Sequence, residues 1–124
     1  MPLKLGCIEK DLTEVFEMIE LNKDNCDAEV LQEKNMPVVV DFWGPTCPEC
    51  LALMPHYEAL EKKFGAKIKF TKVDCSKKRS VAMKFRVMGM PTFIFFKNGA
   101  EVKRMVREQC TAETIKTEIE TLTA

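Results

Sequence analysis

The 124-residue sequence has no net charge and no long apolar run, and both absences exclude classes of protein. Its 19 Lys and Arg residues are balanced by 19 Asp and Glu residues. That balance excludes a basic nucleic-acid-binding protein that relies on bulk electrostatics. No apolar run approaches the roughly 20 residues that a membrane span needs, so no membrane partner is expected. The chain also lacks internal repeats, and its length suits one domain.

The N-terminus lacks the features of a secretory signal. Residues 1–18 (MPLKLGCIEKDLTEVFEM) carry charges throughout and contain no uninterrupted apolar segment. We therefore expect a reducing, cytoplasmic setting, in which the six cysteines are not an extracellular disulfide framework. Four cysteines are dispersed through segments typical of core or element ends, where a free cysteine packs as a small apolar side chain: Cys7, Cys26, Cys75 and Cys110. Among these, Cys7 and Cys110 are the candidates for exposure.

A resident metal is also not expected. A closed structural zinc site needs four ligands, commonly supplied by two Cys-x-x-Cys pairs. Only Cys47 and Cys50 form such a pair, and His56 is the one histidine. A metal-bridged dimer, and with it a metal-binding or interaction module, is left as an alternative function.

Hydrophobic patterns predict strands that alternate with helices and end in a hairpin. The run Val38–Trp43 is almost continuously apolar and β-branched, which is typical of a parallel strand buried on both faces. Asn98-Gly99 is a hairpin signal. The order of elements predicts an α/β fold with a mixed sheet and helices on both faces. We expect helices at 9–16, about 25–34, 46–64, about 77–85 and 111–123, and strands at 18–21, 38–43, 67–74, 92–96 and 101–106.

The Cys-x-x-Cys pair follows a buried strand and opens a helix. Thr46 and Glu49 fit the reciprocal pattern of a helix cap, and Pro48 falls in the first turn, where its missing N–H does little harm. The two sulfurs lie one turn apart, close enough for a disulfide. Because free N–H groups and the helix dipole stabilise an anion there, Cys47 should be an exposed, nucleophilic thiolate. Cys50, one turn inside, should be the shielded, resolving thiol.

Several segments around this pair together resemble the thioredoxin family. They are Val-Val-Val-Asp-Phe-Trp at 38–43, Pro55 after the pair, Gly-Met-Pro-Thr-Phe at 89–93 and Phe-Lys-Asn-Gly at 96–99. The resemblance covers about residues 18–124. It implies a thioredoxin fold with a four- to five-stranded mixed sheet in a domain at 18–124. Residues 1–17 would be an N-terminal helical extension.

The resemblance also implies an activity and a set of catalytic residues. The protein would be a thiol-disulfide oxidoreductase that uses a Cys47–Cys50 disulfide and no bound cofactor. Asp41 matches the family's buried carboxylate, and Lys72 matches the lysine that accompanies it. Since burial raises the pKa of a carboxyl group, Asp41 could exchange a proton with Cys50. Alternatively, Asp41 and Lys72 form a buried ion pair with no catalytic role.

Three further positions match the part of the family that contacts substrates. Pro91 matches a cis-proline, which would place the backbone of Met90 beside the dithiol, where it could pair with an extended substrate strand. Trp43 stands in the family's usual place and would pack beside the pair. The simpler interpretations are an ordinary trans proline at Pro91 and a core-filling role for Trp43.

This chain departs from the family pattern next to the cysteines. Thr46 replaces the usual tryptophan before the first cysteine, and Pro48 and Glu49 replace Gly-Pro between the two. Glu49 opposes the Cys47 thiolate, whereas the helix dipole favours it. Arg107 falls near a family glycine that helps to line the partner groove, so it could select acidic partners or point to water.

The resemblance implies partners as well. Thioredoxin reductase would return the pair to the dithiol, protein disulfides would be the substrates, and the chain would be a monomer. The segment Thr-Cys-Pro-Glu-Cys at 46–50 also suggests an alternative, a glutaredoxin-like protein that reduces glutathione mixed disulfides. A second alternative is the metal-binding or interaction module.

Overall fold

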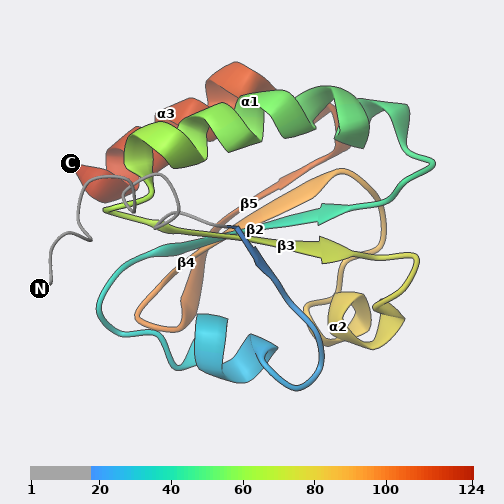
Figure 1. Ribbon diagram of the computed structural model, residues 1–124, viewed down its shortest axis with the longest axis horizontal. Coiled ribbons are helices and arrows are strands. Elements are labelled where there is room, and N and C mark those ends of the chain that lie inside the picture. Colours follow the sequence, from blue (N-terminus) through green and yellow to red (C-terminus); the bar gives the residue numbers. More distant parts are fainter. Residues whose placement is uncertain (1–17) are drawn as a thin grey trace, which may run out of the picture.

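A computed structural model describes residues 18–124, which form a five-stranded mixed sheet between two layers of helices (Figure 1). The strands are β1 (Ile19–Glu20), β2 (Val38–Trp43), β3 (Lys69–Asp74), β4 (Thr92–Lys97) and β5 (Ala100–Val106). Their order in the sheet is β1-β3-β2-β4-β5. The first three are parallel to one another, and β4 and β5 are antiparallel to their neighbours. The predicted extension at 1–17, its helix at 9–16 and Cys7 lie outside the described residues.

Strand β2 lies at the centre of the sheet, as its sequence predicts. Its residues from Val38 to Phe42 are all buried. It pairs in parallel with β3 on one side and antiparallel with β4 on the other. Since both faces of the sheet carry helices, apolar side chains are favoured at every position rather than at alternate ones. Since β2 ends at Trp43, the chain passes directly from this buried strand into the turn before Cys47.

The helices cover the two faces unequally (Figure 1). Helices α1 (Pro48–Phe64) and α3 (Ala112–Thr123) lie on one face. The short helix α2 (Arg79–Lys84) and a π-helical segment at Asp27–Leu31 lie on the other.

The helix predicted at about 25–34 is wrong in type and length. Only the five-residue π-helical segment forms, after a turn in which the Asn22 carboxamide oxygen accepts hydrogen bonds from the N–H groups of Asp24 (2.8 Å) and Asn25 (2.9 Å). Together with the bond from the Asn22 N–H to Asn25 Oδ1 (2.7 Å), these bonds cap the start of the segment.

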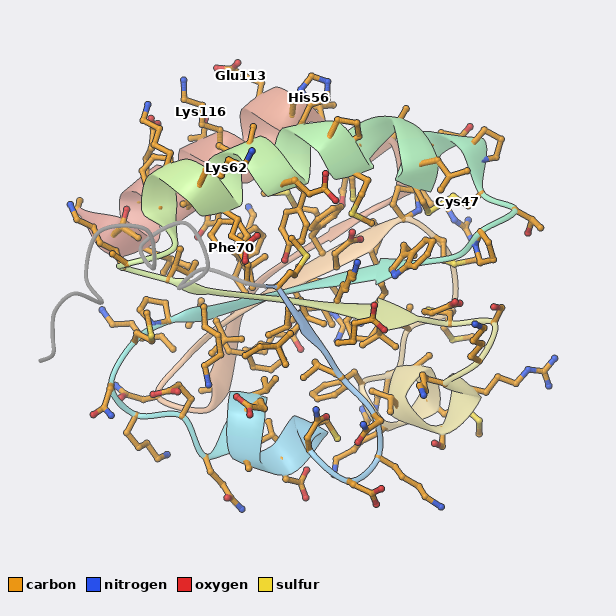
Figure 2. The ribbon with its side chains drawn as sticks, in the orientation of Figure 1. Cys47, His56, Lys62, Phe70, Glu113 and Lys116 are labelled. Carbon is orange, nitrogen blue, oxygen red and sulfur yellow. A yellow bond between two sulfur atoms is a disulfide. The ribbon has the colours of Figure 1, made fainter. Side chains whose placement is uncertain are left out.

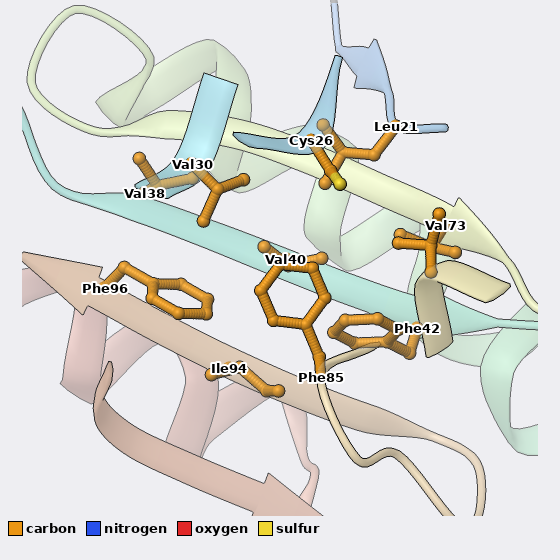
Figure 3. Close-up of a cluster of buried hydrophobic side chains, with 11 residues drawn as sticks. Leu21, Cys26, Val30, Val38, Val40, Phe42, Val73, Phe85, Ile94 and Phe96 are labelled. Atoms are coloured by element: carbon orange, nitrogen blue, oxygen red, sulfur yellow. The ribbon is translucent and has the colours of Figure 1, made fainter. Parts of the chain in front are cut away.

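Two apolar clusters hold these layers to the sheet. The cluster under α2 is drawn in Figure 3 and comprises Leu21, Cys26, Val30, Val38, Val40, Phe42, Val73, Val81, Phe85, Ile94 and Phe96. The cluster under α1 and α3 comprises Val39, Tyr57, Ile68, Phe70, Phe93, Phe95, Met105, Cys110, Ile115 and Ile119. Burial of each large side chain contributes about 1.5–3 kcal/mol. The core is therefore divided by the sheet, and the Cys47–Cys50 pair lies at the edge of the α1 layer.

The β4–β5 hairpin forms at the predicted Asn-Gly turn. Asn98 has φ 54° and Gly99 has φ 78°, and Lys97 pairs with Ala100. A Cβ atom on Gly99 would overlap the backbone carbonyl of Leu31, so glycine fits this position for two reasons. Within residues 18–124, no helix is long and apolar enough to span a membrane.

Candidate active site

The two cysteines of the pair form a disulfide at the N-terminus of α1 (Figure 2). Their Cα atoms lie 5.2 Å apart. Cys47 is the N-cap residue, and its Sγ accepts a hydrogen bond from the N–H of Cys50 at 3.2 Å. The expectation that Thr46 caps the helix is therefore wrong. Cys47 has the extended backbone of a cap (φ −102°, ψ 105°), so the first helical residue is Pro48.

The two sulfur-bearing residues differ in exposure. Cys47 keeps 9% of its surface exposed and Cys50 keeps 1%. Cys47 is less exposed in the disulfide than expected, but it is the more accessible of the two, as predicted. The carboxylate of Glu49 lies close to the pair, with Oε1 4.0 Å from Sγ of Cys47. Negative charge at this distance opposes a thiolate.

Asp41 is a buried carboxyl group without a hydrogen-bond partner. It is 1% exposed, and neither side-chain oxygen accepts a hydrogen bond in the structure. Burial raises the pKa of Asp41 to about 8, while the positive charge of Lys72 lowers it to a smaller extent. In turn, burial and the charge of Asp41 raise the pKa of the nearby Tyr57 hydroxyl well above its usual value. Asp41 is therefore protonated more readily than an ordinary carboxylate and can exchange a proton near neutral pH.

Lys72 lies beside Asp41 but pairs with another residue. The two face each other in the β2–β3 register, yet the ion pair that Lys72 makes is with Glu20 of β1, at 3.7 Å. Its ammonium group also lies 5.9 Å from the centre of the Trp43 ring. The alternative interpretation, a direct ion pair between Asp41 and Lys72, is thus wrong, because Lys72 pairs with the edge strand β1 instead. Its pairing with Glu20 was not expected from the sequence.

The segment before β4 brings a second predicted residue to the disulfide end of the sheet. The Met90–Pro91 peptide bond is cis, as the resemblance implied. The Met90 side chain packs against Gly44, where an added Cβ would lie 3.1 Å from both the sulfur and the terminal methyl carbon. Gly44 is part of the turn that leads to Cys47, since its carbonyl accepts the Cys47 N–H at 3.2 Å. Met90 therefore lies next to the turn that carries the disulfide.

A groove of about 630 Å³ runs along this side of the molecule. Its lining comes from α1, from Met90 and Pro91, and from the segment that leads into α3. The lining residues are Glu49, Ala52, Leu53, His56, Met90, Pro91, Arg107, Glu108, Cys110, Thr111 and Ala112. Glu49, Met90 and Pro91 were predicted as substrate contacts. The residues after β5 were missed, Arg107 apart, because only the hairpin and α3 bring them to the groove.

The other predicted contact residues lie around the pair without forming part of this groove. Thr46 and Pro48 are exposed on either side of Cys47, and Trp43 is half-buried at the end of β2. The indole N–H of Trp43 is buried and has no hydrogen-bond partner in the structure.

The remaining described cysteines are free thiols. Cys26 and Cys110 are buried, which excludes an exposed Cys110, and Cys75 is half-buried. Burial raises the pKa of the Cys75 and Cys110 thiols to about 11 in each case, and the charge of Asp41 adds to both shifts. Neither thiol is activated as a nucleophile. Among residues 18–124, no three His, Cys, Asp or Glu side chains are grouped so as to hold a metal ion.

A cysteine pair that caps a helix and follows a buried central strand, with the residue before a cis-proline packed against its turn, defines a thiol-disulfide redox protein. Comparison with known proteins gives the same class. The family model described as thioredoxin matches residues 17–121. A thioredoxin of Acetoanaerobium sticklandii is 40% identical over 99 residues, covering 80% of this chain and 93% of that protein. A thioredoxin of Peptoclostridium acidaminophilum is 35% identical over 98 residues, covering 79% and 88%.

Solved structures show the same fold. The thioredoxin of Malassezia sympodialis has a TM-score of 0.77 and 26% identity, with 87% of this chain and 92% of that chain covered. A mutant thioredoxin from Halobacterium salinarum has a TM-score of 0.76, with 88% and 93% covered. The chain belongs to the thioredoxin family, and its Cys47–Cys50 pair makes it a thiol-disulfide oxidoreductase. These matches do not favour the glutaredoxin-like or metal-binding alternatives.

Proposed function

We propose that the protein reduces disulfides of other proteins, with Cys47 as the attacking thiolate and Cys50 as the resolving thiol. The observation that carries this division is the position of the two sulfurs. Cys47 caps α1, where the free N–H groups of the first turn stabilise an anion, and it is 9% exposed. Cys50 is 1% exposed one turn further into the helix, where a bulky substrate disulfide cannot reach it.

The reaction then takes two exchanges. The Cys47 thiolate attacks one sulfur of the substrate disulfide, the substrate S–S bond breaks, and the first substrate thiolate leaves. Cys50 loses its proton and attacks Sγ of Cys47. The mixed disulfide breaks and releases the second substrate thiolate, and the Cys47–Cys50 disulfide forms. The substrate gains the two electrons that the dithiol loses.

Asp41 is the proposed acceptor of the Cys50 proton. Its pKa of about 8 means that most of the group is protonated at pH 7 and that the ionised fraction grows as the pH approaches 8. It makes no hydrogen bond that would have to break before it could take up a proton. Lys72 supports this role by lowering the pKa of Asp41, an effect smaller than that of burial.

The surface around the disulfide is proposed to hold the substrate. Met90 makes no backbone hydrogen bond to another described residue, so an extended substrate segment can pair with it. The neighbouring Trp43, Thr46, Pro48, Glu49 and Pro91 would shape the contact. Since the relatives are thioredoxins, we expect a thioredoxin reductase to reduce the Cys47–Cys50 disulfide after each turnover. We also expect the protein to be a monomer in a cytoplasmic setting. The dithiol itself carries the electrons, so the reaction needs no bound cofactor.

The test is to trap the mixed disulfide. Cys50→Ser should reduce no insulin on turnover but should form a covalent adduct with insulin that a reducing agent releases. Cys47→Ser should form no adduct and show no turnover. Cys75→Ser, a half-buried cysteine outside the site, is the matched control and should keep the wild-type rate. An adduct on Cys47→Ser but not on Cys50→Ser would reverse the two roles.

A further inference from the structure

Arg107 has a backbone conformation that is unfavourable for any residue other than glycine. Its φ is 52°, in the left-handed region where a side chain is costly and glycine is favoured. The position is fixed by backbone bonds on both sides: the Arg107 N–H donates to the Pro91 carbonyl at 2.8 Å, and the Arg107 carbonyl accepts from the Cys110 N–H at 2.9 Å. A strained backbone beside a groove points to a functional role for the residue that adopts it.

The side chain lies at the substrate groove. Its guanidinium group rests against Gly89, where an added Cβ would lie 2.8 Å from Nε and 2.9 Å from Cζ. Gly89 immediately precedes Met90 and the cis-proline. Arg107 also lines both the 630 Å³ groove and a smaller depression of about 200 Å³ on the other side of it. It therefore forms the wall between them, next to the segment on which a substrate strand would pair.

The charge of Arg107 is not neutralised within the described residues. The ion pairs there occupy other cations: Lys69 with Glu29 and Glu33, Lys72 with Glu20, Lys84 with Asp27, and Arg104 with Glu101. Glu108 and Glu49 line the same groove as Arg107, but neither pairs with it. A partner can thus meet an available cation at Arg107 and negative charge at Glu49.

Apolar side chains and two further arginines lie around this cation. Met88 is 90% exposed, and Met90 and Val106 are 36% and 39% exposed. Met88 and Val106 line the depression with Arg107, as do Arg86 and the Arg104 that pairs with Glu101, whereas on the groove side Met90 lies with Arg107. A patch of this composition fits a partner segment with one carboxylate among apolar side chains. A uniformly acidic segment fits less well, because it would also meet Glu49.

We propose that Arg107 is a specificity-determining residue that binds a single carboxylate on the substrate segment next to its reactive disulfide. The proposal rests on the function proposed above. It concerns only which disulfides are preferred and not the exchange of sulfur bonds.

The experiment compares two cyclic disulfide peptides that differ by one residue beside a cysteine, Asp in one and Lys in the other. The wild type should reduce the Asp peptide with a kcat/KM about threefold to tenfold higher at low ionic strength. The preference should shrink from about 0.02 M to about 0.5 M salt, because salt screens an exposed pair. Arg107→Gly should abolish the preference, Arg107→Glu should reverse it, and Arg107→Lys should keep part of it.

Controls separate the possible failures. Each variant is judged by the ratio of its two kcat/KM values, so a change in overall rate cancels. Arg107→Gly suits the left-handed backbone, and a melting temperature at or above that of the wild type would show that it folds. Lys97→Glu changes a charge at the far end of β4 from Pro91 and should keep the wild-type ratio. A preference retained in Arg107→Glu, or equal reduction of both peptides by the wild type, would overturn the proposal. Reduction of neither peptide would instead reject the proposed reductase function.

Discussion

Asp41 and Lys72 occupy paired positions on adjacent strands, yet they do not form an ion pair. The Lys72 ammonium lies 3.7 Å from Glu20 at the edge of the sheet, and the Asp41 carboxyl group is left buried without a hydrogen bond. A carboxyl group in these surroundings is stabilised in its protonated form, so its pKa lies at about 8. This arrangement suits a proton acceptor better than a structural ion pair.

Asp41→Asn should stabilise the oxidised protein at neutral pH. Because the folded-state pKa of Asp41 is raised, the native state binds this proton more tightly than the unfolded state does. Stability is then lost as the pH rises from about 4 to about 8, and it changes little above that. The substitution removes this loss, so the free energy of unfolding at pH 7 should rise by about 1–3 kcal/mol.

Urea denaturation from pH 4 to pH 9 measures this effect. The difference between Asp41→Asn and the wild type should grow with pH up to about 8. The same variant should resolve mixed disulfides more slowly, since the proton acceptor is gone. A stability difference that does not change with pH would show that the Asp41 carboxyl is not protonated in the way described.

Lys72→Met should raise the pKa of Asp41 further. Among residues 18–124, Lys72 is the one charge that lowers this pKa, and it does so across adjacent strands. Infrared titration of the carboxyl group in the oxidised protein would report the shift. Lys63→Met, on α1 beside Phe64, removes a charge without this effect and is the control. An unchanged titration in Lys72→Met would mean that burial alone sets the pKa.

Glu49→Gln should make Cys47 more reactive. The Glu49 carboxylate lies 4.0 Å from the Cys47 sulfur and opposes its ionisation. Without it, alkylation of Cys47 by iodoacetamide should be faster at pH 6–7, by about twofold to tenfold. The control is Glu120→Gln, at an exposed position near the end of α3, in which Cys47 should be alkylated at the wild-type rate. Slower alkylation of Glu49→Gln would show that Glu49 assists the thiolate instead.

Gly99→Ala should destabilise the fold. Its φ of 78° disfavours a side chain, and a Cβ there would overlap the Leu31 carbonyl, so the free energy of unfolding should fall by about 1–3 kcal/mol. Gly65→Ala is the control, because Gly65 has φ −62°. Thermal melts of both variants test the prediction, and equal melting temperatures would contradict it.

The sequence indicates most of the fold because its strongest patterns are local. The continuous apolar run of β2 and the Asn-Gly turn each determine a structure without reference to distant residues. A helix after Asn22 is predictable, but its π-helical bond from the Gln32 N–H to the Asp27 carbonyl and its end at Leu31 have no local signal in the sequence.

The site is predictable only in part. The disulfide and the cis Met90–Pro91 bond follow from the matched motifs. The N-cap of α1 was not predicted correctly. Thr46 fits the capping pattern in the sequence, but Cys47 is the N-cap residue and its sulfur accepts the capping hydrogen bond. The pairing of Lys72 with Glu20 depends on the register of β1 against β3, which a two-residue strand does not reveal in its sequence.

The most direct test of the account is the pH dependence of alkylation at each cysteine of the reduced protein, followed by mass spectrometry of the Cys47 and Cys50 peptides. The account predicts that Cys47 reacts first, with half-maximal rate at a pH below the roughly 8.5 of a free thiol, and that Cys50 stays protected. A Cys47 that reacts as an ordinary thiol, or a Cys50 that reacts before it, would contradict the claim that the helix N-terminus activates Cys47.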